Sequence, residues 1–355
     1  MQRLHPEFRL NGTSHDAKTL GAAAQVWVND DDAETHALGI FILEWLSDDT
    51  NVSLQTSGST GTAKQLDVPK ASMNESAQRT GTFFELRAGN TALLCLPIRY
   101  IAGKMMLVRA MTLGLHLDVI TPKTTFELNG KSYDFVALIP LQAQQNLAQL
   151  KRFKTILIGG APINTKLQKA LAATHSNCIE TYGMTETLTH VATRPITYPA
   201  VAFRAMPGID IATGSDNCLV LNVPYASPST ITTQDVVKLV DEHSFYLLGR
   251  KDWVINSGGK KIIPEQLEET LGAVLSIPFF FTSLPDETLG EQMVLVAQAP
   301  KTQTDALLAM AQSVLGADKH HIPKDVICLD AFVYTATAKL DRKATHKKLL
   351  ANLGL

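Results

Sequence analysis

Short apolar runs alternate with amphipathic stretches through the first half of the chain. The apolar runs at residues 91–96, 135–139 and 155–158 predict buried strands. The spacing of apolar positions at 103–113, 141–150 and 164–174 predicts a helix after each of these strands. Strands that alternate with helices are typical of βαβ units, so we expect an α/β fold with a mixed, largely parallel sheet.

The pattern changes after Pro199. Short strand-like runs at 218–223 and 244–248 predict a more antiparallel, barrel-like region. A helix over 263–275, with Pro264 in its first turn, and further strands are expected beyond it. We therefore expect two domains, a large one over residues 1–250 and a small α+β one over residues 251–355.

Composition narrows the class of protein. The 355 residues suit two or three domains at roughly 150 residues each. Lys plus Arg number 32 and Asp plus Glu 34, a net charge of −2, so no basic excess is present to bind nucleic acid. The longest apolar stretch, 93–117, is interrupted by Arg99, Lys104 and Arg109, so we expect no membrane span. The four cysteines lie far apart and residues 1–12 lack the apolar core of a signal peptide, which favours a reducing, cytoplasmic location without a zinc site.

Residues 54–64, LQTSGSTGTAK, are rich in Ser, Thr and Gly and end in a lysine. Glycines let backbone N–H groups approach an anion, and the hydroxyls and the lysine add donors and charge. The pattern predicts a phosphate-binding loop, and the alternative is a flexible Gly/Ser loop. The P-loop NTPase motif G-x-x-x-x-G-K-[ST] does not fit, because Gly58 and Gly61 are three residues apart and Lys64 follows three residues later.

Two later segments complete a specific set of motifs. Residues 180–186 read ETYGMTE, and residues 249–268 read GRKDWVINSGGKKIIPEQLE. With the loop at 54–64, and in this order, they resemble the adenylate-forming superfamily of acyl-CoA synthetases, luciferases and peptide-synthetase adenylation domains. The resemblance implies that superfamily's fold: a large N-terminal domain, here truncated by the loss of most of the usual N-terminal subdomain, and a small mobile C-terminal lid domain.

The resemblance also implies which positions bind ATP. The loop at 56–64 would hold the β- and γ-phosphates, residues 159–161 would line the adenine, and Tyr182 would stack on it. Thr185 would contact the α-phosphate, Glu186 would reach Mg²⁺, and Asp235 and Arg250 would bond the ribose. The implied nucleotide-binding residues are Thr56, Ser57, Gly58, Ser59, Thr60, Gly61, Lys64, Gly159, Gly160, Ala161, Tyr182, Gly183, Asp235 and Arg250. Apart from the motifs, Tyr182 could equally be a core aromatic, and Glu186 and Asp235 ordinary surface carboxylates.

Members of this superfamily work in two steps. A carboxylate attacks the α-phosphorus of ATP to give an acyl-adenylate and pyrophosphate, and a thiol, usually that of coenzyme A, then attacks the mixed anhydride. A late lysine neutralises charge in the first step. Residues 335–342, TATAKLDR, resemble the motif P-x-T-x-x-G-K-x-x-R and make Lys339 the candidate, although Val333 and Ala338 stand where Pro and Gly are usual. The alternative is an ordinary solvated lysine.

The second step uses a different orientation of the small domain in this superfamily. Asp252 matches the hinge position, and the loop Ser257, Gly258 and Gly259 would line the tunnel for the thiol. Two adjacent glycines suit a site where a ligand passes close to the backbone. The alternative is a simple β-turn.

The early position of the phosphate loop resembles the short o-succinylbenzoate–CoA ligases of menaquinone synthesis. In those ligases an L-P-x-x-aromatic-x-x-G stretch is followed by an arginine nine residues after the aromatic. Here Tyr100 is the aromatic, Gly103 the glycine and Arg109 the arginine, and all three become candidates for substrate binding. Arg109 lies on an apolar helix face, where a charge is costly unless it is paired. Its partner is either a substrate carboxylate or a structural Asp or Glu, unless its side chain reaches solvent.

The resulting hypothesis is an AMP-forming ligase that joins o-succinylbenzoate to coenzyme A with ATP and Mg²⁺, in menaquinone biosynthesis. One alternative is another aryl- or acyl-CoA ligase, or an enzyme that loads a carrier protein. A second alternative is a nucleotide-binding relative without catalysis. The expected partners are small molecules rather than nucleic acid or membrane, and the surface left by the missing N-terminal region suggests a homodimer.

Overall fold

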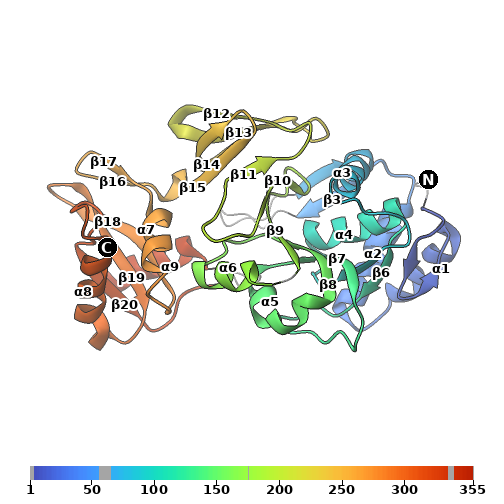
Figure 1. Ribbon diagram of the computed structural model, residues 1–355, viewed down its shortest axis with the longest axis horizontal. Coiled ribbons are helices and arrows are strands. Elements are labelled where there is room, and N and C mark those ends of the chain that lie inside the picture. Colours follow the sequence, from blue (N-terminus) through green and yellow to red (C-terminus); the bar gives the residue numbers. More distant parts are fainter. Residues whose placement is uncertain (1–3, 56–64, 175, 335–339, 355) are drawn as a thin grey trace.

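The computed structural model describes residues 4–55, 65–174, 176–334 and 340–354. Within these residues the strands form sheets of thirteen, five and two strands. Figure 1 shows an elongated molecule in which the C-terminal elements form a lobe beside a larger body. The change from one large sheet to the next falls between β15 (Ser244–Arg250) and β16 (Ile255–Ser257). The domain boundary at residue 250 stays a prediction.

Parallel strands form the centre of the thirteen-stranded sheet, in the order β9-β8-β7-β5-β6. Their bounds are β5 (Thr91–Leu94), β6 (His116–Val119), β7 (Tyr133–Leu138), β8 (Phe153–Ile158) and β9 (Asn177–Gly183). The connecting helices are α4 (Ile101–Leu113), α5 (Pro140–Gln145) and α6 (Thr165–Ala172). These strands read as apolar runs because helices and loops bury them. The predicted α/β class with a largely parallel sheet is confirmed.

Antiparallel strands extend this sheet at one end. They are β10 (His190–Pro195), β11 (Phe203–Ala205), β12 (Asp210–Thr213), β13 (Cys218–Asn222), β14 (Thr230–Asp241) and β15. The antiparallel pairing predicted after Pro199 is present. β10 pairs with β9, β11 pairs with β10 and β15 pairs with β11, so the strands continue the main sheet through hydrogen bonds. β10 and β11 separate β15 from β9 in the sheet order, yet Tyr182 of β9 contacts Asp235 of β14 and Phe245 of β15.

The N-terminal elements cover the other end of the sheet (Figure 1). They are β1 (Arg9–Leu10), β2 (Thr13–Ser14), α1 (Ala17–Trp27), α2 (Ala33–Leu46), β3 (Asn51–Gln55), β4 (Gln65–Pro69) and α3 (Lys70–Phe83). The side chains of Asp16 and Asp32 accept hydrogen bonds from backbone N–H groups at the starts of α1 and α2. β3 and β4 form an antiparallel pair, and the residues of the predicted phosphate loop, 56–64, lie between them in the sequence and outside the described residues.

The C-terminal lobe has its own sheet and its own core. Its elements are β16, β17 (Lys260–Ile262), α7 (Pro264–Leu271), β18 (Phe279–Asp286), β19 (Gly290–Gln298), α8 (Thr304–Leu315), β20 (Asp325–Leu329) and α9 (Arg342–Leu353). Its buried apolar residues form clusters distinct from those of the larger body. A separate core is what allows such a lobe to move as a unit.

Two predicted helices differ from the structure. The helix expected over 141–150 ends at Gln145, and a 3₁₀ helix, η1 (Leu147–Arg152), follows. The Asn146 side chain donates to the carbonyls of Gln142 and Thr124 and accepts from the N–H of Phe126, and these bonds replace helical ones. The helix expected over 263–275 ends at Leu271, before Gly272, a residue that disfavours helix by about 1 kcal/mol relative to alanine.

Candidate active site

The candidate nucleotide site lies at the carboxyl ends of β8 and β9, where open α/β sheets bind ligands. Gly159 follows β8, and its N–H donates to the carbonyl of Leu138 at 3.1 Å. A Cβ at Gly159 would lie 2.3 Å from Thr181 Oγ1, and Gly160 has a φ of +82°. Only glycine fits both positions without strain, so the predicted adenine wall is built by backbone placed against β9.

Three residues predicted to bind nucleotide form one hydrogen-bonded chain. The hydroxyl of Tyr182 donates to Asp235 Oδ2 at 2.5 Å, and Arg250 Nη1 donates to Asp235 Oδ1 at 3.2 Å. Asp235 pairs with Arg250 across β14 and β15, whereas Tyr182 comes from β9. Tyr182 and Asp235 are each 8% exposed. Burial, followed by the charge of Asp235, raises the pKa of Tyr182 above its ordinary value, so its hydroxyl stays protonated as the donor.

The ring of Tyr182 packs into an aromatic cluster. Its centroid lies 5.4 Å from that of Phe245, edge to face, and 6.1 Å from that of Phe203. At 8% exposure, little of Tyr182 is open to a ligand. The predicted stacking on adenine stays a prediction, and the core-aromatic alternative describes the packing seen here.

The turn after β9 presents the residues predicted to act on the α-phosphate and metal. Thr187 fixes the turn: its hydroxyl is bonded to the N–H and carbonyl of Met184 and to the carbonyl of Thr189. Thr185 is half-buried and Glu186 is exposed. Within the described part of the chain no ion pair engages Glu186, so its carboxylate suits a hard cation such as Mg²⁺ that also takes substrate phosphates.

A second polar cluster surrounds Arg109, on α4. Arg109 is 3% exposed, and its Nη2 donates to Thr189 Oγ1. No aspartate or glutamate among the described residues pairs with its guanidinium, and its Nε is buried without a hydrogen-bond partner. Burial lowers the pKa of Arg109 to about 10, so the group is still a cation at neutral pH. The structural ion pair considered from the sequence is therefore absent from the described residues, and Arg109 does not reach solvent.

Two residues beside Arg109 were not identified from the sequence. His190 is 6% exposed, its Nδ1 lies 3.0 Å from Thr189 Oγ1, and its Nε2 is buried without a partner. Burial and the charge of Arg109 lower the pKa of His190 well below its ordinary value, so the ring is neutral at pH 7. Tyr225 is 6% exposed and lies close enough to interact with the charge of Arg109. The only sequence signal for Thr189 and His190 was that they follow the ETYGMTE motif by three and four residues.

Gly183 joins the two clusters. It pairs with His190 across β9 and β10, and a Cβ at this position would lie 2.3 Å from the carbonyl oxygen of Thr189. Glycine is therefore required for β10 to approach β9 this closely. The nucleotide residues and the Arg109 cluster are neighbours because of that approach.

Gly103 lies on the same helix as Arg109, and Tyr100 directly precedes that helix. Tyr100 precedes α4 as its N-cap and is half-buried, with the Arg99 guanidinium 5.1 Å from its ring centroid. A Cβ at Gly103 would lie 2.3 Å from the carbonyl oxygen of Pro97. The geometry gives Gly103 a packing reason, and the roles of both residues in substrate binding stay predictions.

The predicted hinge and thiol-tunnel residues follow β15. Asp252, in the 3₁₀ turn η3 (Lys251–Trp253), accepts a hydrogen bond from Arg250 Nη2 at 2.8 Å. Ser257 ends β16, and Gly258 and Gly259, with φ of +57° and +78°, form the turn into β17. The N–H of Gly258 donates to the carbonyl of Leu289, inside the C-terminal lobe. The β-turn geometry is present, and a role in a tunnel stays a prediction.

Comparison with known proteins places the chain in a family. The model of the AMP-binding enzyme family matches residues 22–216, more than half of the chain. The chain belongs to the AMP-binding enzyme family. A curated relative from Mycobacterium tuberculosis, "Probable 2-succinylbenzoate--CoA ligase", is 27% identical over 335 residues, which cover 86% of each chain. The activity common to these matches is that of an adenylate-forming acid–CoA ligase.

Two solved structures support the same placement of this AMP-binding enzyme. An acyl-CoA synthetase (AMP-forming)/AMP-acid ligase II-like protein from Dyadobacter fermentans is 33% identical with a TM-score of 0.60, and the match covers 93% of this chain and 98% of that one. The o-succinylbenzoate coenzyme A synthetase of Bacillus subtilis in complex with ATP and magnesium ion has a TM-score of 0.72 at 19% identity, over 83% of this chain and 69% of that one. The second match shows that the fold is shared. The N-terminal domain of this chain is smaller than that of the Bacillus subtilis structure.

Part of the predicted site of this AMP-binding enzyme lies outside the described residues. The whole phosphate loop, residues 56–64, and Lys339 belong to that part. Their roles rest on the sequence alone.

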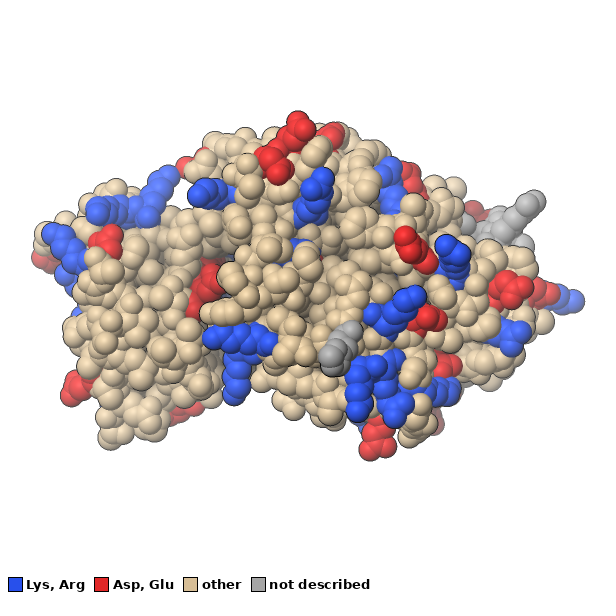
Figure 2. Space-filling view, viewed as in Figure 1, with Lys and Arg blue, Asp and Glu red and all other residues tan. Residues whose placement is uncertain are grey.

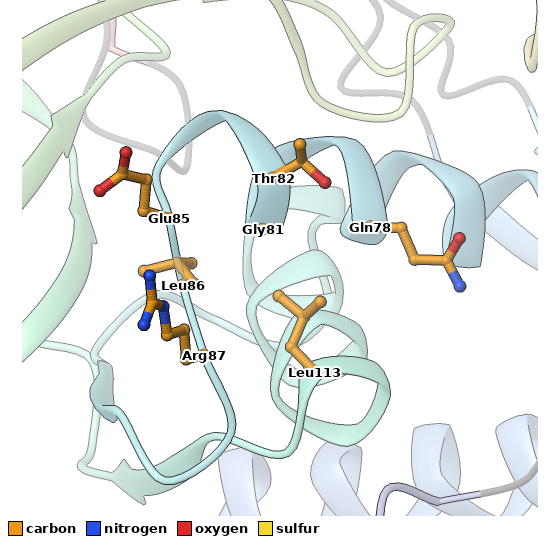
Figure 3. Close-up of a pocket in the computed structure, with 7 residues that line it drawn as sticks. All are labelled: Gln78, Gly81, Thr82, Glu85, Leu86, Arg87 and Leu113. Atoms are coloured by element: carbon orange, nitrogen blue, oxygen red, sulfur yellow. The ribbon is translucent and has the colours of Figure 1, made fainter.

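A hollow of about 480 Å³ lies away from the predicted site residues. Figure 3 shows it between the end of α3 and Leu113 of α4, with Gln78, Glu85 and Arg87 around it. It opens to solvent and carries none of the motif residues.

In Figure 2, blue and red side chains are interspersed across the visible face, as the net charge of −2 leads one to expect. No helix of the described residues is long and apolar enough to cross a membrane.

Proposed function

We propose that this chain is an ATP-dependent, AMP-forming ligase that joins o-succinylbenzoate to coenzyme A, a step of menaquinone biosynthesis. The observation that carries the substrate assignment is Arg109, a buried cation without a carboxylate partner in the described residues. A buried charge costs several kcal/mol unless it is paired, so this site favours an anionic ligand. The name of the Mycobacterium tuberculosis relative and that of the Bacillus subtilis structure support the same substrate.

A diacid explains the arrangement of two neighbouring clusters. One carboxylate of o-succinylbenzoate must lie at the α-phosphorus of ATP, beside Thr185. The other would bind the guanidinium fork of Arg109. Thr189 Oγ1 already binds Arg109, and the orphaned Nε2 of the neutral His190 offers one further hydrogen bond. Because His190 stays neutral, the diacid meets a single fixed positive charge.

Tyr182, Asp235 and Arg250, which are linked by hydrogen bonds, would contact the nucleotide. Asp235 would accept from the ribose hydroxyls through the lone pairs that Tyr182 and Arg250 leave free, since a carboxylate has about four acceptor sites. Gly159, Gly160 and Ala161 would lie along the adenine. The residues present therefore suit ATP at the carboxyl ends of β8 and β9.

In the first step, the substrate carboxylate would attack the α-phosphorus, and pyrophosphate would leave. Thr185 would hold an α-phosphate oxygen, while Lys64 and Lys339 would neutralise charge on the departing and transferring phosphates. Glu186 and the substrate phosphates would hold Mg²⁺, which supplies positive charge to the phosphates when bound. In the second step, the thiol of coenzyme A would attack the acyl carbon, and AMP would leave.

The two steps would use the two lobes differently. Residues 1–250 would bind ATP and the acid, and residues 251–355 would turn about Asp252 and bring Ser257, Gly258 and Gly259 to the thiol. The homodimer and the cytoplasmic location remain parts of this proposal that rest on the sequence.

The test is pyrophosphate release over a panel of aryl acids, keto acids and diacids, with and without coenzyme A. We expect release with o-succinylbenzoate and ATP alone, and formation of the thioester and AMP only when free coenzyme A is added. Thioester formed on a carrier protein but not on coenzyme A would favour the carrier-loading alternative. ATP binding without pyrophosphate release for any acid would favour the non-catalytic one.

A further inference from the structure

We propose that Glu265 is a positioning residue that holds the C-terminal lobe in the orientation used for the first, adenylate-forming step. This inference rests on the proposed function for the identity of that step. Glu265 lies in α7, beyond the predicted hinge at Asp252. Its Oε1 accepts a hydrogen bond from the backbone N–H of Arg250 at 3.1 Å, in the last residue of β15. The bond therefore joins the lobe to the large sheet.

Gly249 makes the approach of Glu265 to β15 possible. A Cβ at Gly249 would lie 2.4 Å from Glu265 Oε2 and 2.5 Å from Ile263 Cγ2. Both of these atoms belong to the C-terminal lobe, whereas Gly249 belongs to the large sheet. A side chain at this position would thus displace the Glu265 carboxylate and the Ile263 side chain from their places against β15.

Glu265 is half-buried, but one of its carboxylate oxygens is fully enclosed. Its Oε2 is buried without a hydrogen-bond partner in the described residues, and burial raises its pKa above the ordinary range. Arg342, at the start of α9, lies close enough to offset part of this cost. Arg342 is itself tied to Glu268 of α7, and its guanidinium carbon is 5.9 Å from the ring centroid of Trp253 in the hinge turn. These contacts keep α7 and α9 together behind Glu265.

A second, exposed contact crosses the same boundary. Asp216, in the turn between β12 and β13, pairs with Lys261 of β17 at 3.0 Å and with Lys251 of the hinge turn at 2.9 Å. Exposed ion pairs contribute little to stability, so this contact is evidence for the orientation of the lobe more than a source of its stability. Rotation about Asp252 would break the pair between Asp216 and Lys261 together with the bond between Glu265 and Arg250.

The orientation held by these contacts is not arranged for the thiol step. The Ser257–Gly259 turn is bonded to Leu289 and Gly290 within its own lobe. Figure 1 shows the β16–β17 hairpin at the outer side of the lobe, away from the strands β8 and β9 of the large body. The predicted thiol tunnel is thus turned away from the acyl site, which leaves the first step as the one this arrangement can serve.

The test separates the two half-reactions in four variants. Gly249→Ala inserts the blocking Cβ, Glu265→Ala removes the acceptor, Glu265→Gln keeps an acceptor oxygen of the same reach, and Gly21→Ala is the matched glycine control, with its nearest contact at 3.8 Å. We expect Gly249→Ala and Glu265→Ala to slow pyrophosphate release about 10-fold or more. Thioester formation from preformed acyl-adenylate should be unchanged or faster, and Glu265→Gln and the control should behave as the wild type.

A crosslinking readout makes the test independent of the substrate assignment. The four native cysteines are buried, so a pair introduced as Asp216→Cys and Lys261→Cys can be joined selectively by a short bismaleimide. We expect efficient crosslinking in this pair alone and in combination with Glu265→Gln, and a several-fold loss with Gly249→Ala or Glu265→Ala. If crosslinking changes in this way but no acid supports pyrophosphate release, the role of Glu265 in holding the lobe is supported and the proposed function fails. Two results would overturn this role of Glu265. One is an equal loss of both half-reactions with a lowered Tm, and the other is unchanged crosslinking in both Gly249→Ala and Glu265→Ala.

Discussion

Replacing Arg109 with alanine removes the buried cation on which the substrate assignment depends. In the structure Arg109 is 3% exposed and has one neutral partner, Thr189, with no carboxylate of the described residues paired to it. If a substrate carboxylate is the missing partner, Arg109→Ala weakens binding of the diacid and leaves the nucleotide site intact.

The expected magnitude follows from that burial. A hydrogen bond to a charged group contributes up to about 3 kcal/mol, and each 1.4 kcal/mol is tenfold in affinity, so the KM for the diacid should rise about 10²-fold. The KM for ATP should barely change, because no hydrogen bond or ion pair of the described residues joins Arg109 to Tyr182, Asp235 or Arg250. Loss of an uncompensated buried charge offsets part of the cost of the cavity, so we expect Tm to fall by only a few degrees.

The assay is initial-rate pyrophosphate release against the concentration of o-succinylbenzoate and of a mono-acid analogue that lacks the second carboxylate. The analogue should be a poor substrate for the wild type and no poorer for Arg109→Ala. Arg87→Ala, which removes an exposed arginine at the rim of the hollow in Figure 3, is the matched control and should match the wild type on both acids. If Arg109→Ala reduces activity equally on both acids, or unfolds the protein, Arg109 is a structural residue and the diacid assignment loses its main support.

Three further variants test other parts of the site. Lys339→Ala should abolish pyrophosphate release yet leave thioester formation from preformed acyl-adenylate largely intact, and normal pyrophosphate release would contradict its role. Asp252→Pro should preserve adenylation and strongly reduce transfer to coenzyme A, because proline fixes φ at the hinge; a proportional loss in both half-reactions would indicate misfolding instead. Asp235→Asn should raise the KM for ATP about 10-fold, by removing the charge that binds Arg250 and accepts from ribose, with the KM for the acid unchanged; titrations of both substrates check this, and an unchanged KM for ATP would argue against ribose binding.

The sequence was sufficient to predict those strands whose formation depends on the apolar character of their own residues. The apolar runs at 91–96, 135–139 and 155–158 became β5, β7 and β8, because a strand covered on both faces needs apolar side chains throughout. It was insufficient at Asn146, whose side chain ends α5 through bonds to Thr124 and Phe126, some twenty residues away in the sequence. No periodicity within 141–150 reveals those partners.

In the candidate site too, the sequence identified some residues, whereas their contacts became known only from the structure. The motifs identified Tyr182, Asp235 and Arg250 as separate candidates, and only the pairing of β14 with β15 and of β9 with β10 shows how Asp235 comes to bind the other two. Glu265 gave no signal, because a glutamate in the first turn of a helix is ordinary until its neighbour is known to be Gly249.

The sequence by itself determined the alternation of strands and helices over residues 91–174, the set of motifs and hence the class of chemistry, since these depend on residue type and spacing along the chain. For Arg109 it determined an apolar helix face and therefore a charge in need of a partner. Tertiary structure alone decided that Thr189 and His190 surround that charge, that no described carboxylate neutralises it, and that Glu265 reaches across the hinge to Arg250. The physical reason is that burial and desolvation depend on every group within a few ångströms, and those groups come from strands and helices distant in the chain.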